Sequence, residues 1–112
     1  MSYKLGVIWH GPEISALIKR QIQVNLLKCG MDLLSESVKE APKDTGDLRG
    51  NCTVDESKLD QLEITVGYSL PYARIQHENL NFRHTDGKAK FLEDPYNRQK
   101  DKYKRLIGSV RL

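Results

Sequence analysis

Between Pro12 and Pro42 lies a long series of apolar residues spaced three and four positions apart. Such spacing places the apolar side chains on one face of a helix. Pro12 and Glu13 suit a first helical turn, and the residue before Pro42 is biased away from helical geometry. We therefore predict one helix of roughly 28 residues that ends near Glu40. Its apolar face consists of Ile14, Ile18, Ile22, Leu26, Cys29 and Leu33.

A second apolar set on the same stretch widens the hydrophobic surface, and we expect such a helix to be contacted from two sides. One small sheet and one short helix cannot cover both sets. Leu17, Leu27 and Leu34 are therefore candidates for contact with another molecule, and Gly30 is a candidate bend. The full second set is Leu17, Val24, Leu27, Met31, Leu34 and Val38.

Three shorter segments have the pattern of β-strands. Residues 3–9 are rich in strand-favouring types and are followed by a glycine and a proline. Apolar and polar residues alternate over 48–55 and again over 62–68. This alternation predicts two half-buried strands, and the short polar connection between them predicts an antiparallel hairpin with one solvated face.

Near the end of the chain, Asp94 and Pro95 are read as the N-cap and first position of a final helix. Residues 79–90 are polar, and we expect them to be mobile until a partner orders them. The sequence thus predicts a single α+β domain over residues 1–112, with the long N-terminal helix and the C-terminal helix packed on a small antiparallel β-sheet. The partly apolar stripe of the final helix is Tyr96, Gln99, Lys100, Tyr103, Leu106 and Ile107.

Length and composition narrow the class of protein. A chain of 112 residues forms one domain with one modest core. No apolar run reaches the roughly 20 residues of a membrane helix, and no small-residue cleavage site follows the N-terminal apolar patch. We expect a soluble cytoplasmic protein without membrane contact. Cys29 and Cys52 lack the spacing of a metal or redox motif and are expected to be buried thiols.

Asp44, Thr45 and Gly46 form the three-residue signature of aspartic proteases. In those enzymes two carboxylates share one proton, and a short chain obtains the second carboxylate by dimerising. Here the signature follows the charged end of a helix instead of a buried apolar strand. We interpret it as a structural turn, in which Asp44 and Thr45 accept backbone hydrogen bonds and Gly46 takes a positive φ.

Four potential metal ligands, His77, Glu78, His84 and Asp86, lie within ten residues. Their spacing matches neither a helical pair nor a zinc finger, so we expect solvated loop residues. The sequence has no glycine-rich phosphate loop and no recognisable nucleophile. We predict no catalytic residues, no metal and no cofactor.

Several short motifs follow one another along the chain. After the long helix, residues 42–51 read PKDTGDLRGN; residues 66–78 read VGYSLPYARIQHE; and residues 88–96 read KAKFLEDPY before the last helix. In this order they resemble the minor capsid and tail-component proteins of long-tailed bacteriophages, over roughly residues 5–107. The chain departs from that family after Glu78, where it has Asn79 and Leu80 in place of a frequent Gly-Thr pair. The matching positions are Pro42, Asp44, Thr45, Gly46, Leu48, Arg49, Tyr72, Ala73, Glu78, Phe91 and Leu92.

The resemblance implies an α+β fold without enzymatic activity. It also implies a ring of copies that joins the head connector to the tail, in contact with phage connector and tail proteins. Such a protein resides in the host cytoplasm during assembly and then in the neck or tail of the virion. Two alternatives stay open: a small basic nucleic-acid-binding or regulatory module, and, more remotely, a dimeric protease through Asp44.

Charge is distributed unevenly along the chain. The net charge is +3, yet residues 83–112 hold nine Lys or Arg against four acids. A ring joins one surface to a different surface on the next copy, so we expect the acidic first part and the basic last helix to direct this contact. The acids are Asp44, Asp47, Asp55, Glu56 and Asp60, and the basic candidates are Arg98, Lys100, Lys102, Lys104 and Arg105.

Overall fold

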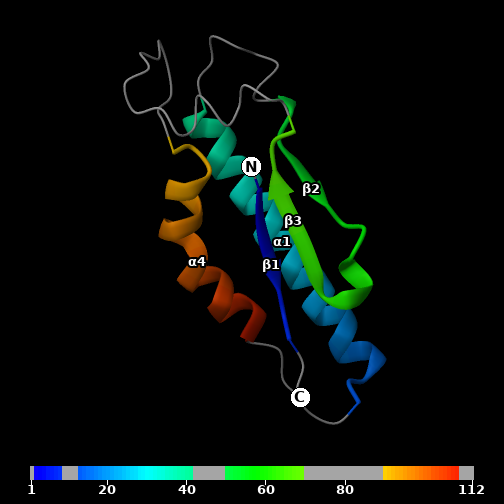
Figure 1. The fold of residues 1–112 in the computed structure, drawn as a ribbon. Coiled ribbons are helices and arrows are strands. Elements are labelled where there is room, and N and C mark those ends of the chain that lie inside the picture. Colours follow the sequence, from blue (N-terminus) through cyan, green and yellow to red (C-terminus); the bar gives the residue numbers. More distant parts are fainter. Residues whose placement is uncertain (1, 9–12, 42–49, 70–89, 109–112) are drawn as a thin grey trace.

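The computed structural model describes residues 2–8, 13–41, 50–69 and 90–108 (Figure 1). Two helices lie against a small antiparallel sheet, which confirms the predicted α+β fold. The elements follow one another as strand β1 (Ser2–Gly6), helix α1 (Ala16–Glu40), strand β2 (Thr53–Asp55), 3-10 helix η1 (Leu59–Gln61), strand β3 (Glu63–Gly67) and helix α4 (Glu93–Gly108).

Strand β3 lies in the middle of the three-stranded sheet, with β1 and β2 paired antiparallel on its two sides. Leu5 lies opposite Ile64, and Val54 lies opposite Val66, so these four side chains share one face of the sheet. Figure 1 shows α1 running behind the sheet and α4 beside β1. The predicted hairpin of β2 and β3 is confirmed, and β1 completes the sheet.

The strands are shorter than the sequence pattern predicts. Strand β1 ends at Gly6, and only Thr53–Asp55 of the predicted strand over 48–55 pair with β3 among the described residues. Leu62 ends η1 with a positive φ of 59°, so β3 begins one residue later than predicted. The alternation of apolar and polar residues therefore predicted which face of the sheet each side chain lies on, while turn geometry determined where the strands end.

Helix α1 begins at Ala16, four residues after Pro12, which corrects the predicted start. Ser15 is the N-cap, and its side-chain oxygen accepts a hydrogen bond from the backbone N–H of Ile18 at 3.2 Å. A serine in this position satisfies one of the N–H groups that a helix start leaves unpaired. The end at Glu40 agrees with the prediction, and Ile22, Leu26, Cys29 and Leu33 of the predicted apolar face are buried.

Gly30 allows α1 to approach the sheet closely. A Cβ at this position would lie 2.5 Å from Cδ1 of Ile64 and 3.2 Å from Cγ1 of Val54. Helix α1 continues through Gly30 as one element from Ala16 to Glu40. The glycine therefore serves helix–sheet packing, a role that the sequence alone did not suggest.

Helix α4 begins at Glu93, so Asp94 lies inside the helix and is not its N-cap. The backbone N–H of Asp94 donates to the carbonyl of Lys90 at 2.9 Å, and that of Tyr96 donates to Leu92 at 3.1 Å. Pro95 fits here because the first four residues of a helix have no intrahelical acceptor for their N–H groups. Pro95 is buried, and Glu93 and Asp94 place negative charge at the positive end of the helix dipole.

The core lies between the sheet and the two helices. Phe91, just before α4, is fully buried and meets the ring of Tyr68 edge-on, with the ring centroids 5.1 Å apart. Tyr3 of β1 stacks on Tyr96 of α4 at 4.4 Å, which joins the edge of the sheet to the second helix. The buried hydrophobic residues are Leu5, Ile22, Leu26, Cys29, Leu33, Ala41, Cys52, Leu62, Ile64, Val66, Tyr68, Phe91, Leu92 and Tyr103.

Candidate assembly surfaces

Several sequence predictions fall on residues outside those that the structure describes. These are the turn of Asp44, Thr45 and Gly46, the four potential metal ligands in 77–86, and residues 79–89 of the predicted mobile loop. Over 2–8, 13–41, 50–69 and 90–108, no three His, Cys, Asp or Glu side chains are placed to hold a metal ion.

The two cysteines are buried free thiols, as the sequence analysis predicted. Burial and, to a smaller extent, the nearby carboxylate of Asp32 raise the pKa of Cys29 to about 11, against an opposing effect of Lys102. Burial likewise raises the pKa of Cys52 to about 11, against a smaller opposing effect of Tyr68. A thiol with a raised pKa is protonated at neutral pH and is a poor nucleophile or metal ligand. Both cysteines therefore serve packing.

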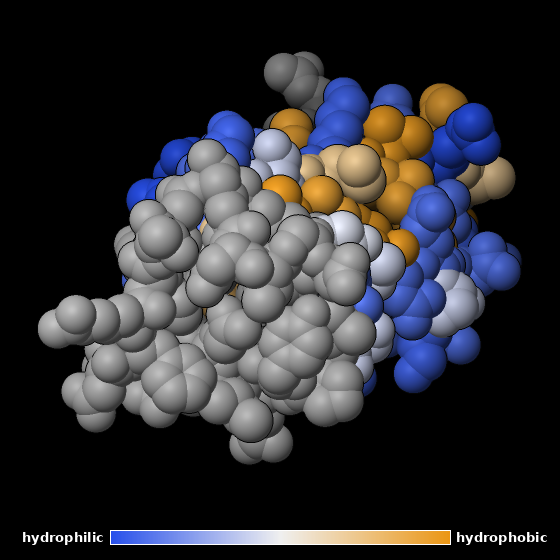
Figure 2. Space-filling model, turned by 90° about the horizontal axis from the view of Figure 1, so that it is seen from above, coloured by the Kyte–Doolittle hydropathy of each residue, from blue (hydrophilic) through white to orange (hydrophobic). Residues whose placement is uncertain are grey.

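The second apolar set of α1 is largely at the surface. Leu17 is 71% exposed, Met31 is 56% exposed and Val24 is 41% exposed. These three residues lie seven positions apart, so they form one line along the helix. Leu27 and Leu34 are half-buried and pack against the edge of the core. Figure 2 shows hydrophobic residues reaching the surface among hydrophilic ones on one side of the described part. We call the line of Leu17, Val24 and Met31 the α1 stripe.

Two of the five basic candidates on α4 contact acids of α1 in the same chain. Nη2 of Arg98 lies 2.7 Å from Oε2 of Glu40 and 3.6 Å from Oε2 of Glu36. The hydrogen bond to Glu40 raises the pKa of Arg98, whose guanidinium stays charged. Nζ of Lys102 lies 3.7 Å from Oδ2 of Asp32. Both basic side chains are about half exposed, so each pair contributes at most about 1 kcal/mol to folding.

Lys100, Lys104 and Arg105 form no ion pair with another described residue, and Lys104 and Arg105 are exposed. Lys100 and Lys104 line a groove of about 140 Å³ between α4 and β1, together with Lys4 of the strand. Tyr96, Tyr103 and Ile107 also line it. Sequence analysis missed Lys4 because the strand and the helix meet only in the folded chain. We call this feature the β1–α4 groove.

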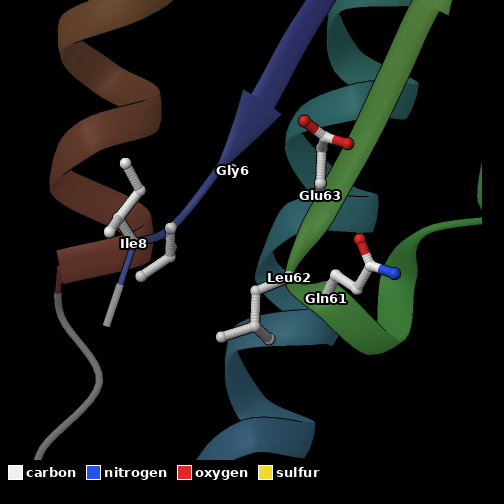
Figure 3. A pocket seen from close by; sticks show the side chains of 6 residues that line it. Gly6, Ile8, Gln61, Leu62 and Glu63 are labelled. Carbon is white, nitrogen blue, oxygen red and sulfur yellow. The ribbon is translucent and has the colours of Figure 1, made fainter. Parts of the chain in front are cut away.

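A wider hollow of about 340 Å³ lies at the end of the sheet where β1 leaves it (Figure 3). Ile8, which is 81% exposed, and the buried Leu62 provide its apolar part, while Gln61 and Glu63 flank Leu62 in the chain. Among the described residues that line it, Glu63 is the one with a titratable side chain.

An acidic surface occupies the opposite edge of the sheet from α4. Asp55 ends β2, and Glu56 and Asp60 follow it in the turn and in η1; all three are exposed. Oδ1 of Asp55 accepts a hydrogen bond from the backbone N–H of Ser57 at 2.9 Å, which lowers the pKa of Asp55. Nε2 of Gln23 donates to the carbonyl of Leu59 at 3.2 Å and fixes η1 to α1. We call Asp55, Glu56 and Asp60 the acidic edge.

Comparison with known protein families matches residues 13–78 to the HK97-gp10-like family, described as "Bacteriophage HK97-gp10, putative tail-component". The match spans more than half of the chain. The chain belongs to this family. Searches among curated proteins and among solved structures found no match for it.

The match to the HK97-gp10-like family covers α1, β2, η1 and β3, and therefore includes the α1 stripe and the acidic edge. Strand β1 and helix α4 lie outside the matched residues, and with them the β1–α4 groove. In the described ranges, no helix of this family member is long and apolar enough to cross a membrane. The predicted relationship to phage tail components is confirmed.

Proposed function

We propose that this member of the HK97-gp10-like family is a non-enzymatic structural protein that joins the head connector of a phage to its tail. It assembles in the host cytoplasm, contacts connector and tail proteins, and resides in the virion as a ring of copies. The observation that carries the proposal is the presence of unlike surfaces on one small domain: the acidic edge at β2 and the basic residues of α4.

Unlike surfaces suit a ring because each copy must present one surface to its left neighbour and a different one to its right neighbour. Exposed charges attract weakly and are screened by salt, so they orient the approaching copies more than they hold them. Apolar contact supplies most of the free energy of association. Leu17 of the α1 stripe, with Leu27 and Leu34 at its border, supports this part of the proposal.

The structure refines the choice of basic residues. Arg98 and Lys102 are engaged by acids of α1, so their reversal to glutamate would also weaken the contact between α1 and α4 within the subunit. Lys100, Lys104 and Arg105 form no such pair in the described part of the chain. These three are the better residues for a contact between subunits.

The function can be tested by complementation of a phage that lacks the gene for this protein. Without the protein, filled heads and tails should accumulate separately in electron micrographs, and wild-type protein supplied in trans should join them. Joined particles in its absence would refute the proposed function. Loss of a protease or a DNA-binding module would instead alter processing or packaging, so that filled heads would not accumulate.

The α1 stripe is tested in the same system with Leu17→Gln, Val24→Gln and Met31→Gln combined. Glutamine keeps helix propensity and removes the apolar surface, so the variant should fold normally but join few particles. Ile8→Gln is the matched control, since Ile8 is the most exposed large hydrophobic residue in the described ranges and lies away from α1. Equal yields of joined particles from both variants would show that the α1 stripe is not part of the assembly surface.

A further inference from the structure

Strand β1 has an open edge. Its partner β3 lies on one side, and no described strand lies on the other. The N–H of Val7 donates to the carbonyl of Leu62 at 2.9 Å, so Val7 and Leu62 form a hydrogen-bonded pair in the antiparallel register. Hydrogen-bonded pairs alternate with non-hydrogen-bonded pairs along an antiparallel ladder. The backbone N–H and C=O groups of Lys4 and Gly6 therefore point away from β3, toward the β1–α4 groove.

The β1–α4 groove combines these backbone groups with positive charge. Lys4, Lys100 and Lys104 line it. Its apolar lining includes Tyr103, which is 2% exposed, and Ile107. A strand edge beside a basic, partly aromatic groove is suited to an extended segment that carries acidic side chains.

The same sheet has such a segment at its other edge. Thr53 and Asp55 lie opposite Gly67 and Thr65 of β3, and the alternation of the ladder turns the N–H and C=O groups of Val54 outward. Asp55, Glu56 and Asp60 follow directly and are exposed. The two open edges of the sheet therefore carry opposite charge, and α4 lies at only one of them (Figure 1).

We propose that the β1–α4 groove of one copy receives β2 and the acidic edge of the next copy. The proposal rests on the ring of the proposed function and assigns its contact. Both β1 and β2 run antiparallel to β3, so they run parallel to each other. A rotation about a ring axis that runs along the strands places β2 of one copy beside β1 of its neighbour in parallel orientation. Each copy uses each edge once, which is the requirement for a closed heterologous ring.

The strand contact is short, because β2 has three residues. Few backbone hydrogen bonds can form, and charge complementarity must select the pairing and its direction. Gln23 holds η1 against α1, so a neighbour that docks on the acidic edge also comes close to the side of α1 that bears Leu27. The strand contact and the apolar contact can therefore act in one interface.

A charge exchange tests this contact. The first variant carries Lys100→Glu and Lys104→Glu; the second carries Glu56→Lys and Asp60→Lys; a third combines all four changes and has the wild-type net charge. Each of the first two should reduce the yield of joined particles at least about tenfold, because like charges then face each other. The third should restore the yield to within about twofold of wild type, because attraction returns with its direction reversed.

Supplying the first two variants together should also restore joining, since copies can alternate around the ring. Circular dichroism and thermal melting verify that each variant is folded. If the quadruple variant joins as few particles as the two double variants, the lysines contact another partner, and the proposed contact is wrong. Loss of salt-dependent DNA binding in the first variant alone would identify that partner as nucleic acid. Wild-type yields of joined particles from both double variants would exclude a contact between the β1–α4 groove and the acidic edge. Separate heads and tails in the gene deletion would still support the proposed function in that case.

Discussion

On one side α1 meets the sheet through side chains that carry no charge, and on the other ion pairs and hydrogen bonds join it to α4. The sheet side holds Leu26 and Leu33, both fully buried, and Gly30 lies against Ile64. The α4 side holds the pairs of Asp32 with Tyr103 and Lys102, at 2.7 and 3.7 Å.

The difference has a physical consequence for each interface. Burial of apolar surface depends little on direction or salt, so the apolar contacts of the sheet side should stabilise the fold more than the polar contacts of the α4 side. Hydrogen bonds and exposed ion pairs contribute less, but they fix how the helices lie against each other. Nδ2 of Asn25, which donates to the carbonyl of Leu106 at 3.2 Å, adds one more directional contact on the α4 side. We infer that α1 and the sheet form the stable base on which α4 is oriented.

Leu33→Ala should destabilise the protein most, because it removes a fully buried side chain from the sheet side. We expect a loss of about 2–5 kcal/mol in the free energy of unfolding, from lost burial and the remaining cavity. Leu17→Ala, at an exposed position of the same helix, is the control and should change stability by less than about 0.5 kcal/mol. Urea denaturation of both variants measures this contrast, and similar losses would contradict the assignment of the two faces.

A smaller loss is expected for Gly30→Ala. The new methyl group would collide with Cδ1 of Ile64, and overpacking of this kind costs about 1–3 kcal/mol. Alanine also gains about 1 kcal/mol of helix propensity, so the net loss should be about 1 kcal/mol. In an Ile64→Val background, which lacks Cδ1, the same substitution should become neutral or stabilising. If the loss were unchanged in that background, a backbone cause such as a bend at Gly30 would be indicated.

On the α4 side, Tyr103→Phe removes the hydrogen bond to Asp32 while keeping the buried ring. The expected loss is about 1 kcal/mol, the typical net value of one hydrogen bond. Tyr96→Phe is the matched control, since Tyr96 contributes its ring to the stack with Tyr3 and should tolerate loss of the hydroxyl. Thermal unfolding by calorimetry distinguishes the two, and equal stabilities would mean that Asp32 does not orient α4 through Tyr103.

The smallest effect is expected for Lys102→Gln, which breaks an exposed pair with Asp32. Its cost should be below about 1 kcal/mol at low salt, and it should vanish near 1 M salt, where charges are screened within about 3 Å. The Leu33→Ala loss should persist at the same salt concentration. If the stability lost in Lys102→Gln did not change with salt concentration, the loss would come from apolar packing and not from the ion pair.

Local pattern predicted much of this architecture. The 3.6-residue periodicity identified the buried face of α1, and Pro42 indicated its end at Glu40, because both signals act within a few residues. Alternation likewise identified the inward residues of β3. Charged residues near the end of the chain were recognised as a basic helix.

Contacts between distant parts of the chain could not be predicted in this way. Arg98 meets Glu40 across 58 positions, and the sequence gives no sign that this arginine is engaged while Lys104 forms no pair with a described residue. From the sequence alone, Gly30 is a candidate bend, and only the position of Ile64 shows that the glycine allows close packing. The groove between Lys4 and Lys100 requires β1 to be placed beside α4, which only tertiary packing determines.

We propose that this HK97-gp10-like protein forms a ring between head and tail by joining unlike surfaces of neighbouring copies. Image reconstruction of the head–tail junction in intact particles tests it most directly. We expect a closed ring of copies at the junction, in which the edge of β1 and α4 in each copy face the acidic edge of the next. A junction that lacks the protein, or copies related by two-fold axes that pair identical surfaces, would contradict it.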